Sequence, residues 1–291
     1  MRLHLVDGTF ELFRAQYSKR PDHHTPDGRP FKAVAGLLSS MIALLTDPAE
    51  AVTHLAIAFD NPIRSFRNDL YAGYKTDEGM DPELRSQFDA AEAAMVALGV
   101  AVWSMDRWEA DDALATAATR WRDEVEQVRI LTPDKDLGQV LHGTRVVQVD
   151  RIRQTETDEA AFRARRGIAP ASLPDFLGLV GDSADGFPGL KGWGETSTAK
   201  VLGRWGHIEA IPAVASDWDV DVRGAERLAS SLRENLADAL LYRTLATVVT
   251  DVPLPQDLDG LRWRGPTAGF VEGCRRTGLS GMVGRVPRVR G

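Results

Sequence analysis

Short apolar runs alternate with longer segments of helical periodicity through the first half of this 291-residue chain. Residues 31–45, 82–99 and 110–121 place apolar side chains at helical spacing. The apolar runs between them are typical of buried strands: RLHLV (2–6), THLAIAF (53–59), VAVW (100–103), VRILT (128–132) and RVVQV (145–149). Strands that alternate with helices form parallel sheets covered on both faces. We therefore predict an α/β fold with a mostly parallel sheet flanked by helices.

From about residue 155 the strand signals stop. Segments 156–167, 171–181, 197–206 and 225–247 are all helical in pattern, and a stretch rich in glycine and proline at 181–194 interrupts them. We predict two domains, an α/β core over residues 1–155 and a helical subdomain over residues 156–291.

The composition is that of a soluble globular protein, with 43% hydrophobic and 26% charged residues. The one cysteine cannot form an internal disulfide and excludes a metal site built from cysteines, which favours a reducing cytoplasm. The longest apolar stretch, residues 33–45, falls short of the roughly 20 residues needed to span a bilayer. We expect a cytoplasmic protein with no membrane partner.

The net charge of −7 argues at first against a polyanionic partner. Its distribution weakens that argument, because the tail from residue 260 carries a single acid, Glu272. The tail has seven arginines, at positions 262, 264, 275, 276, 285, 288 and 290. Net charge therefore does not decide the class of partner.

Acidic side chains follow the predicted strands, where the carboxyl ends of parallel strands share one edge of a sheet. They are Asp7, Asp60, Asp134 and Asp136, joined by Glu109, Asp111 and Asp112 at the start of a predicted helix. Each has a plain alternative: a helix cap or dipole partner for Asp111 and Asp112, a turn residue for Asp7 and Asp60, and a solvated loop for Asp134 and Asp136. Carboxylates that converge repel one another unless they are protonated or bind cations. Oxygen ligands without nearby histidine or cysteine suit Mg²⁺ or Mn²⁺, so we predict a magnesium-type cage.

Several long motifs, in fixed order, resemble those of the bacterial 5′–3′ exonucleases of the flap endonuclease family, which also form the N-terminal domain of DNA polymerase I. The motifs are FDNPIRSFRNDLYAGYK (59–75), WEADDALATAA (108–118), TPDKDLGQVL (132–141) and GLVGDSADGFPGLKGWGETSTAKVL (178–202). The similarity runs from VDGTFELFRAQYS near the start to LLYRTLATVVTDVPLP at 240–255. The resemblance implies a PIN-like nuclease core with an arch at about 75–90. It also implies a helix-hairpin-helix (H3TH) element at about 172–205.

The resemblance also implies a site. Its metal ligands would be Asp7, Asp60, Glu109, Asp111, Asp112, Asp134, Asp136, Asp182 and Asp185, all acidic here. Two or more Mg²⁺ or Mn²⁺ ions would activate a water that attacks a phosphodiester, leaving a 5′-phosphate and a 3′-hydroxyl. Arg14 and Lys75 match basic positions that face the scissile phosphate in the family.

The segment GLKGWGETSTAK (189–200) resembles the hairpin of the family's DNA-binding element. Its glycines would let backbone amides approach a DNA phosphate, and carbonyls of this loop often hold K⁺ in the family. The plain alternative is a tight turn between helices. The DNA-binding residues implied are Gly189, Gly192, Trp193, Gly194, Thr196, Thr198 and Lys200.

The chain departs from the family pattern in three places. The arch carries Asp77, Glu78 and Asp81 where a basic segment is usual, Pro133 replaces a common glycine, and Glu195 stands near the expected phosphate contact. These changes predict altered DNA affinity or flap threading more than lost chemistry.

The leading hypothesis is a structure-specific 5′ nuclease that acts on DNA flaps, nicks or RNA-primer ends. We expect a monomer that carries no polymerase module of its own and works with a separate DNA polymerase and ligase. Two alternatives are a protein that binds branched DNA without cutting it and a phosphohydrolase of small substrates.

Overall fold

The computed structural model describes residues 1–287, which form two compact units. The first unit comprises Met1–Arg64, Asp77–Thr132 and the described residues from Thr250 onward. The second comprises Ser65–Thr76 and Pro133–Val249. Neither unit is one continuous stretch of chain, and the expected domain boundary at residues 155 and 156 stays a prediction. Among residues 1–287, no helix is both long and apolar enough to cross a membrane.

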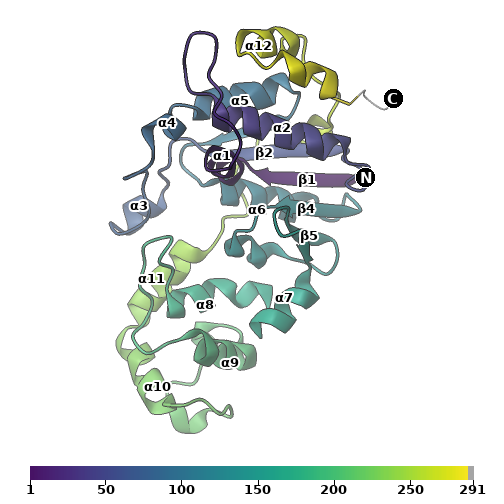
Figure 1. The fold of residues 1–291 in the computed structure, drawn as a ribbon. Coiled ribbons are helices and arrows are strands. Elements are labelled where there is room, and N and C mark those ends of the chain that lie inside the picture. The colour runs from purple at the N-terminus through teal and green to yellow at the C-terminus, as the bar shows by residue number, and fades with distance from the viewer. Residues whose placement is uncertain (288–291) are drawn as a thin grey trace. The chain divides into compact units, whose positions relative to one another are not determined.

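Four parallel strands form the centre of the first unit (Figure 1). They are β1 (Arg2–Asp7), β2 (His54–Asp60), β3 (Ala101–Met105) and β4 (Gln127–Leu131). Strand β1 pairs with β2 and β4, and β3 pairs with the far side of β2. Each lies within a residue or two of an apolar run in the sequence, so the predicted parallel strands are confirmed.

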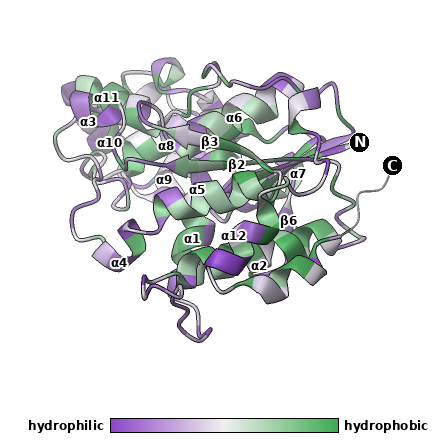
Figure 2. Ribbon diagram, turned by 90° about the horizontal axis from the view of Figure 1, so that it is seen from above, coloured by the Kyte–Doolittle hydropathy of each residue, from purple (hydrophilic) through white to green (hydrophobic). Residues whose placement is uncertain are grey.

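Helices cover both faces of these strands. In Figure 1, α1, α2 and α5 lie on one side of β1 and β2, and α6 lies on the other. The helices of this unit are α1 (Gly8–Gln16), α2 (Lys32–Thr46), α4 (Pro82–Arg85), α5 (Phe88–Ala97), α6 (Ala110–Trp121) and α12 (Phe270–Arg276). Nearly all residues of the two central strands β1 and β2 are buried, and Figure 2 shows β2 in the hydrophobic colour. This arrangement is the predicted α/β fold.

The segment 82–99, expected as one helix, is two. The break lies at Ser86 and Gln87, between α4 and α5. Gln87 is buried, and its side-chain oxygen accepts a hydrogen bond from the backbone N–H of Ala33 at 2.9 Å. The residue therefore serves the first turn of α2, a role that periodicity within its own segment does not reveal.

The second unit is mostly helical. Its strands β5 (Val146–Asp150) and β6 (Thr155–Thr157) form an antiparallel pair. Its helices are α3 (Arg67–Leu70), α7 (Glu159–Arg166), α8 (Leu173–Val180), α9 (Glu195–Trp205), α10 (Ala225–Glu234) and α11 (Leu236–Ala246). A core of apolar and aromatic side chains joins α8 to α11.

Two expectations for this unit were wrong in detail. The strand signals do not stop at 155, because the short strand β6 begins there and pairs with β5 through Asp150 and Thr155. The segment 225–247 is not one helix, because the backbone of Asn235 leaves the helical region between α10 and α11. Pairing with β5 outweighs the polar character of Thr155–Thr157, a tertiary effect that local propensity does not contain.

Candidate metal centre

Five of the nine predicted ligands lie in the first unit, where two of them end neighbouring strands. Asp7 ends β1 and Asp60 ends β2. One carboxylate oxygen of Asp7 accepts the backbone N–H of Phe10 at 2.8 Å, and the other accepts the hydroxyl of Thr132 at 2.9 Å. A Cβ at Gly8 would lie 2.6 Å from the Phe59 ring, so only glycine lets α1 start directly after Asp7. The start of this helix therefore holds Asp7 at the carboxyl edge of the strands.

The other three acids of this unit begin α6. Glu109 and Asp112 form a capping box, in which the Glu109 backbone N–H donates to Asp112 Oδ2 at 2.9 Å. The backbone N–H of Ala110 donates to Asp60 Oδ1 at 2.8 Å, which ties the helix start to the end of β2. The capping alternative therefore applies to Asp112, and Asp111 lies beside it in the first turn.

The remaining four acids lie in the second unit, and three of them meet. Asp136, Asp182 and Asp185 each offer a carboxylate oxygen, and these oxygens all lie within 4.8 Å of one another. Asp136 lies in the 3-10 helix Lys135–Val140, whereas Asp182 and Asp185 lie in the loop between α8 and α9. Asp134 caps the same 3-10 helix by accepting the backbone N–H of Asp136 at 2.9 Å. We call Asp136, Asp182 and Asp185 the aspartate cluster.

The aspartate cluster has the electrostatics of a cation site. Oδ1 of Asp136 is buried and has no hydrogen-bond partner among the described residues. Burial raises the pKa of Asp136 to about 8, and the neighbouring carboxylate of Asp134 adds to that shift. A positive ion among these oxygens would offset both the burial and the repulsion. Buried carboxylate oxygens are the donors that Mg²⁺ and Mn²⁺ prefer, so the residues present fit the predicted ion.

Two lysines contact the aspartate cluster. Nζ of Lys75 lies 2.9 Å from Asp185 Oδ1, so the structure brings this predicted residue to the acids. Nζ of Lys135 lies 2.5 Å from Asp182 Oδ2 and 3.6 Å from Asp136 Oδ1. Burial lowers the pKa of Lys135, but the charges of the surrounding aspartates outweigh it and raise the value to about 12. The sequence analysis missed Lys135, although its place between two acids in TPDKD was a usable signal.

Arg14, the other predicted cation, contacts acidic and polar groups of its own unit. Its guanidinium forms an ion pair with the buried carboxylate of Glu11 and donates to the Ser40 hydroxyl at 2.9 Å. Ser40 in turn donates to Glu11 at 2.9 Å. Helices α1 and α2 therefore hold Arg14 in place, and its role toward a phosphate stays a prediction.

The predicted DNA-binding hairpin lies between α8 and α9 and contains a close backbone crossing. Gly181 and Gly189 both have positive φ, at 91° and 68°. A Cβ at Gly189 would lie 2.3 Å from the backbone nitrogen of Gly181. Gly194 is the N-cap of α9, has open space around it, and needs no positive φ. The two glycines thus serve different purposes, close packing at 189 and an uncovered helix start at 194.

The other predicted hairpin residues divide by exposure. Gly192 and Thr196 are exposed, whereas the side chains of Trp193 and Thr198 are buried. The Trp193 ring packs 6.2 Å from the Trp218 ring, centroid to centroid. The Lys200 ammonium donates to the carbonyl of Asp221 at 2.9 Å. The side chains of Trp193 and Thr198 therefore belong to the core, and their backbone N–H groups donate to the carbonyls of Leu190 and Gly194.

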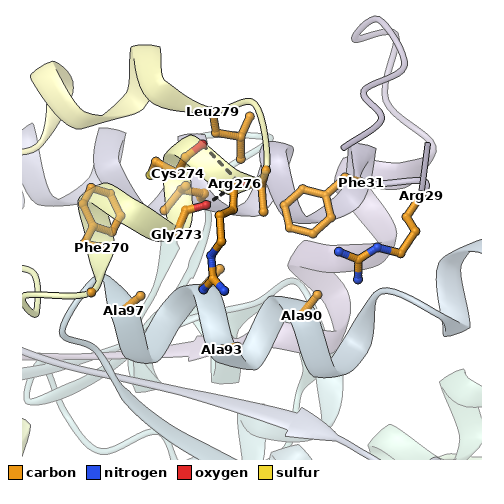
Figure 3. A pocket seen from close by; sticks show the side chains of 14 residues that line it. Arg29, Phe31, Ala90, Ala93, Ala97, Phe270, Gly273, Cys274, Arg276 and Leu279 are labelled. Atoms are coloured by element: carbon orange, nitrogen blue, oxygen red, sulfur yellow. Dashed lines mark hydrogen bonds between the residues drawn. The ribbon is translucent and has the colours of Figure 1, made fainter. Parts of the chain in front are cut away.

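A separate pocket of about 440 Å³ lies in the first unit, against α5 and α12 (Figure 3). Its wall is apolar and includes alanines of α5, Phe31 and Phe270. Two guanidinium groups reach it, and both already have carboxylate neighbours: Arg29 with Asp27 at 2.9 Å and Arg276 with Glu272 at 4.0 Å. Among the described residues that line it there is no carboxylate, so this pocket is not the metal centre.

Comparison with known families identifies the class. Residues 2–167 match the family model of the 5′-3′ exonuclease N-terminal resolvase-like domain, and residues 168–268 match that of the 5′-3′ exonuclease C-terminal SAM fold. The chain belongs to the 5′-3′ exonuclease family, as its motifs predicted. DNA polymerase I of Mycobacterium leprae is 36% identical over 266 residues, which are 89% of this chain and 28% of that protein. The chain thus spans a little over a quarter of the length of this curated relative.

Solved structures show the same fold. A bacteriophage T5 flap endonuclease, in a pseudo-enzyme-product complex with DNA and metal ions, matches with a TM-score of 0.63 and 17% identity, over 98% of this chain and 97% of that one. The catalytic core of Rad2 in complex with a DNA substrate matches with a TM-score of 0.62 and 13% identity, over 98% and 90% of the two chains. At these identities, the likeness supports the fold alone.

Proposed function

We propose that this protein is a structure-specific 5′ nuclease that cuts phosphodiesters in DNA at flaps, nicks or primer ends. The observation that carries the proposal is the aspartate cluster. It gathers three carboxylates within 4.8 Å, and one of their oxygens is buried with no hydrogen-bond partner. Such a group is stable only if it is partly protonated or has positive charge among its oxygens. Membership of the 5′-3′ exonuclease family supports the reaction class.

In this proposal, the nine acids act as ligands of two or more Mg²⁺ or Mn²⁺ ions. Bound divalent ions would polarise the phosphate and make a water molecule more acidic. The chain's own acids would hold those ions in place, and Lys75 and Arg14 would orient the scissile phosphate. Burial of Asp136, Asp182 and Asp185 excludes bulk water from their side of the site.

The proposed DNA contact is the start of α9. Backbone N–H groups at a helix N-terminus bind phosphate without reading sequence, and Gly194 leaves that end uncovered. Gly192, close to it in the chain, is exposed and has a positive φ of 94°. We propose that this hairpin, the expected helix-hairpin-helix at about 172–205, holds the duplex backbone and that its carbonyls bind K⁺.

The proposed partners follow from the relatives. The matched relatives are DNA polymerase I proteins, in which a 5′-3′ exonuclease region is part of a longer chain. We propose that this protein works as a monomer in the cytoplasm, with a DNA polymerase and a ligase that act on the same nicked intermediates.

A second candidate is a protein that binds branched DNA and cuts it weakly or not at all. The acidic arch favours it, because Asp77 and Glu78 are exposed and would repel a single strand. Asp81 is committed to the cap of α4, where it accepts the backbone N–H of Glu83 at 2.9 Å. Asp77 and Glu78 are thus the exposed acids of the arch.

The test is cleavage of a 5′-labelled DNA flap in Mg²⁺, with wild type compared with Asp136→Asn. Removing a residue that hydrogen-bonds to a metal ligand lowers metal affinity or activity by about 10–100-fold. Removing the charge of a ligand itself should therefore reduce cleavage by about 100-fold or more. Glu226→Gln, which neutralises an exposed acid of the same unit, is the matched control and should cleave normally. Undiminished cleavage by Asp136→Asn would contradict the metal assignment. Flap binding by wild type without product, in Mg²⁺ and in Mn²⁺, would favour the second candidate.

A further inference from the structure

We propose that Lys135 is a built-in counter-cation of the aspartate cluster, which competes with a divalent ion for the oxygens of Asp182 and Asp136. The proposal rests on the proposed function and deepens it. It assigns to Lys135 control over how tightly the site binds its metal, a role distinct from that of a ligand or of a phosphate-orienting residue.

The first observation is the position of the ammonium group. Nζ of Lys135 lies 2.5 Å from Asp182 Oδ2 and 3.6 Å from Asp136 Oδ1, and both aspartates belong to the candidate ligand set. Asp182 is 47 positions further along the chain than Lys135. The ammonium therefore bridges the two chain segments that form the cluster.

The second observation is the balance of charge. Three buried carboxylates face two ammonium groups, because Lys75 pairs with Asp185 at 2.9 Å and Lys135 contacts the other two. Lys135 contacts two members of the cluster, Asp136 and Asp182. An ammonium donates hydrogen bonds from a compact point charge, and oxygens occupied by it are less available to a metal ion.

A divalent ion and the ammonium cannot hold the same oxygens. Two positive groups about 4 Å apart repel strongly in a half-buried site, so one of them must withdraw. The lysine can do so, since its four-carbon stem is flexible and its side chain is 36% exposed. Asp136 is buried in the 3-10 helix next to it and has no comparable freedom. The cost of withdrawal weakens metal binding, and the ammonium stabilises the cluster when metal is scarce.

The experiment measures Mn²⁺ binding to the full-length protein by titration calorimetry, without DNA. Lys135→Met keeps the length of the side chain and removes its charge. We expect it to bind Mn²⁺ at this site about tenfold more tightly than wild type does. Lys191→Met removes an exposed charge of the same unit and should leave the affinity unchanged. Asp182→Asn identifies the heat that belongs to the aspartate cluster, because that part of the binding should vanish.

Two further measurements separate competition from other roles. Lys135→Arg keeps the positive charge and should bind Mn²⁺ with an affinity close to that of wild type. In EDTA, Lys135→Met should have a lower melting temperature than wild type. Added Mn²⁺ should raise the melting temperature of Lys135→Met by more than it raises that of wild type. If the Met variant does not fold, Lys135→Gln, which also removes the charge, takes its place and should likewise bind Mn²⁺ more tightly than wild type.

The possible failures are distinct. Mn²⁺ binding that depends on Asp182, but is no tighter in Lys135→Met than in wild type, would overturn the proposed competition. The proposed function would still stand. An Arg variant that binds as tightly as the Met variant would show that charge is not the cause. A lack of any binding that depends on Asp182, in wild type and in Lys135→Met, would overturn both the competition and the metal centre.

Discussion

Asp112 is fully buried, and its carboxylate accepts the backbone N–H of Glu109 at 2.9 Å. The neighbouring Asp111 is only partly buried. Two adjacent acids of one motif therefore differ in burial. At the scale of single residues, the hydrogen-bond partners of a carboxylate show whether it stabilises the fold. The fact that a residue is an aspartate does not show this.

Glu50 gives the clearest pH prediction at this scale. Its carboxylate contacts His4 Nε2 at 3.0 Å and Arg129 Nε at 2.8 Å. The hydrogen bond to His4 and the charge of Arg129 outweigh burial and lower the pKa of Glu50 to about 2, from 4.5. Because the folded-state value lies below the unfolded one, the stabilisation is present above pH 4.5 and is lost as the pH falls towards 2.

We therefore expect Glu50→Gln to lower the free energy of unfolding by about 1–2 kcal/mol at pH 7, after allowance for solvent screening. The difference from wild type should shrink as the pH falls below 4.5. Urea unfolding of both proteins at pH 7, 4 and 3 measures it. A difference that grows in acid would contradict the assignment of the shift.

At the scale of elements, the loop between α8 and α9 does two things. It crosses its own backbone closely at Gly181 and Gly189, and it delivers Asp182 and Asp185 to the aspartate cluster. The isolated bridge between Asp182 and Phe187 tightens the turn that carries both acids. The same loop thus presents the start of α9 and two candidate ligands, so its conformation serves both parts of the proposed function.

Substitutions at two glycines separate folding from DNA contact. Gly189→Ala should cost about 2–4 kcal/mol of stability, because φ is 68° and the new Cβ would lie 2.3 Å from Gly181 N. Gly194→Ala should cost about 1 kcal/mol or less, since nothing lies within 4 Å of its Cβ position.

Gly194→Ala should nevertheless weaken binding of a flap duplex about tenfold, because its methyl group would cover the start of α9. Thermal melting and fluorescence anisotropy measure the two effects. Normal DNA binding by a folded Gly194→Ala protein would argue against a phosphate at this helix start.

At the scale of the whole molecule, the two compact units are interleaved along the chain. The polypeptide passes between them after residues 64, 76, 132 and 249. The last segment, from Thr250 onward, belongs to the first unit and forms hydrogen bonds with the rest of it. The Trp103 indole donates to Gln256 at 2.7 Å, the Trp263 indole donates to the carbonyl of Leu98 at 3.0 Å, and the Val252 N–H donates to Thr116 at 3.1 Å. The residues that follow the helical unit therefore help to complete the α/β unit.

A chain that ends after residue 249 should lose most of its stability. It would lack the buried side chains of Val252, Leu261, Phe270, Cys274 and Leu279. Burial of each large apolar side chain contributes about 1.5–3 kcal/mol, so the loss approaches the roughly 5–15 kcal/mol that a typical domain has. Circular dichroism and urea unfolding compare this fragment with the full-length chain, and a cooperative, stable 1–249 fragment would contradict this prediction.

Two arginines of the basic tail, Arg288 and Arg290, lie outside the described residues. Arg275 pairs with Glu272 at 2.6 Å on α12. The single acid of the tail thus offsets part of its positive charge, which the count of residues alone did not indicate.

The sequence by itself determined the strands, most of the helices and the acids at the strand ends, because periodicity and strand-end position are local properties of the chain. Its motifs also identified the family. Tertiary structure decided the rest: Lys135 beside Asp182, Gln87 turned inward to α2, the side chains of Trp193 and Thr198 in the core, and Asp112 as a cap. The partners of a side chain depend on which distant segments fold against it, and the spacing of residues along one segment does not contain that information.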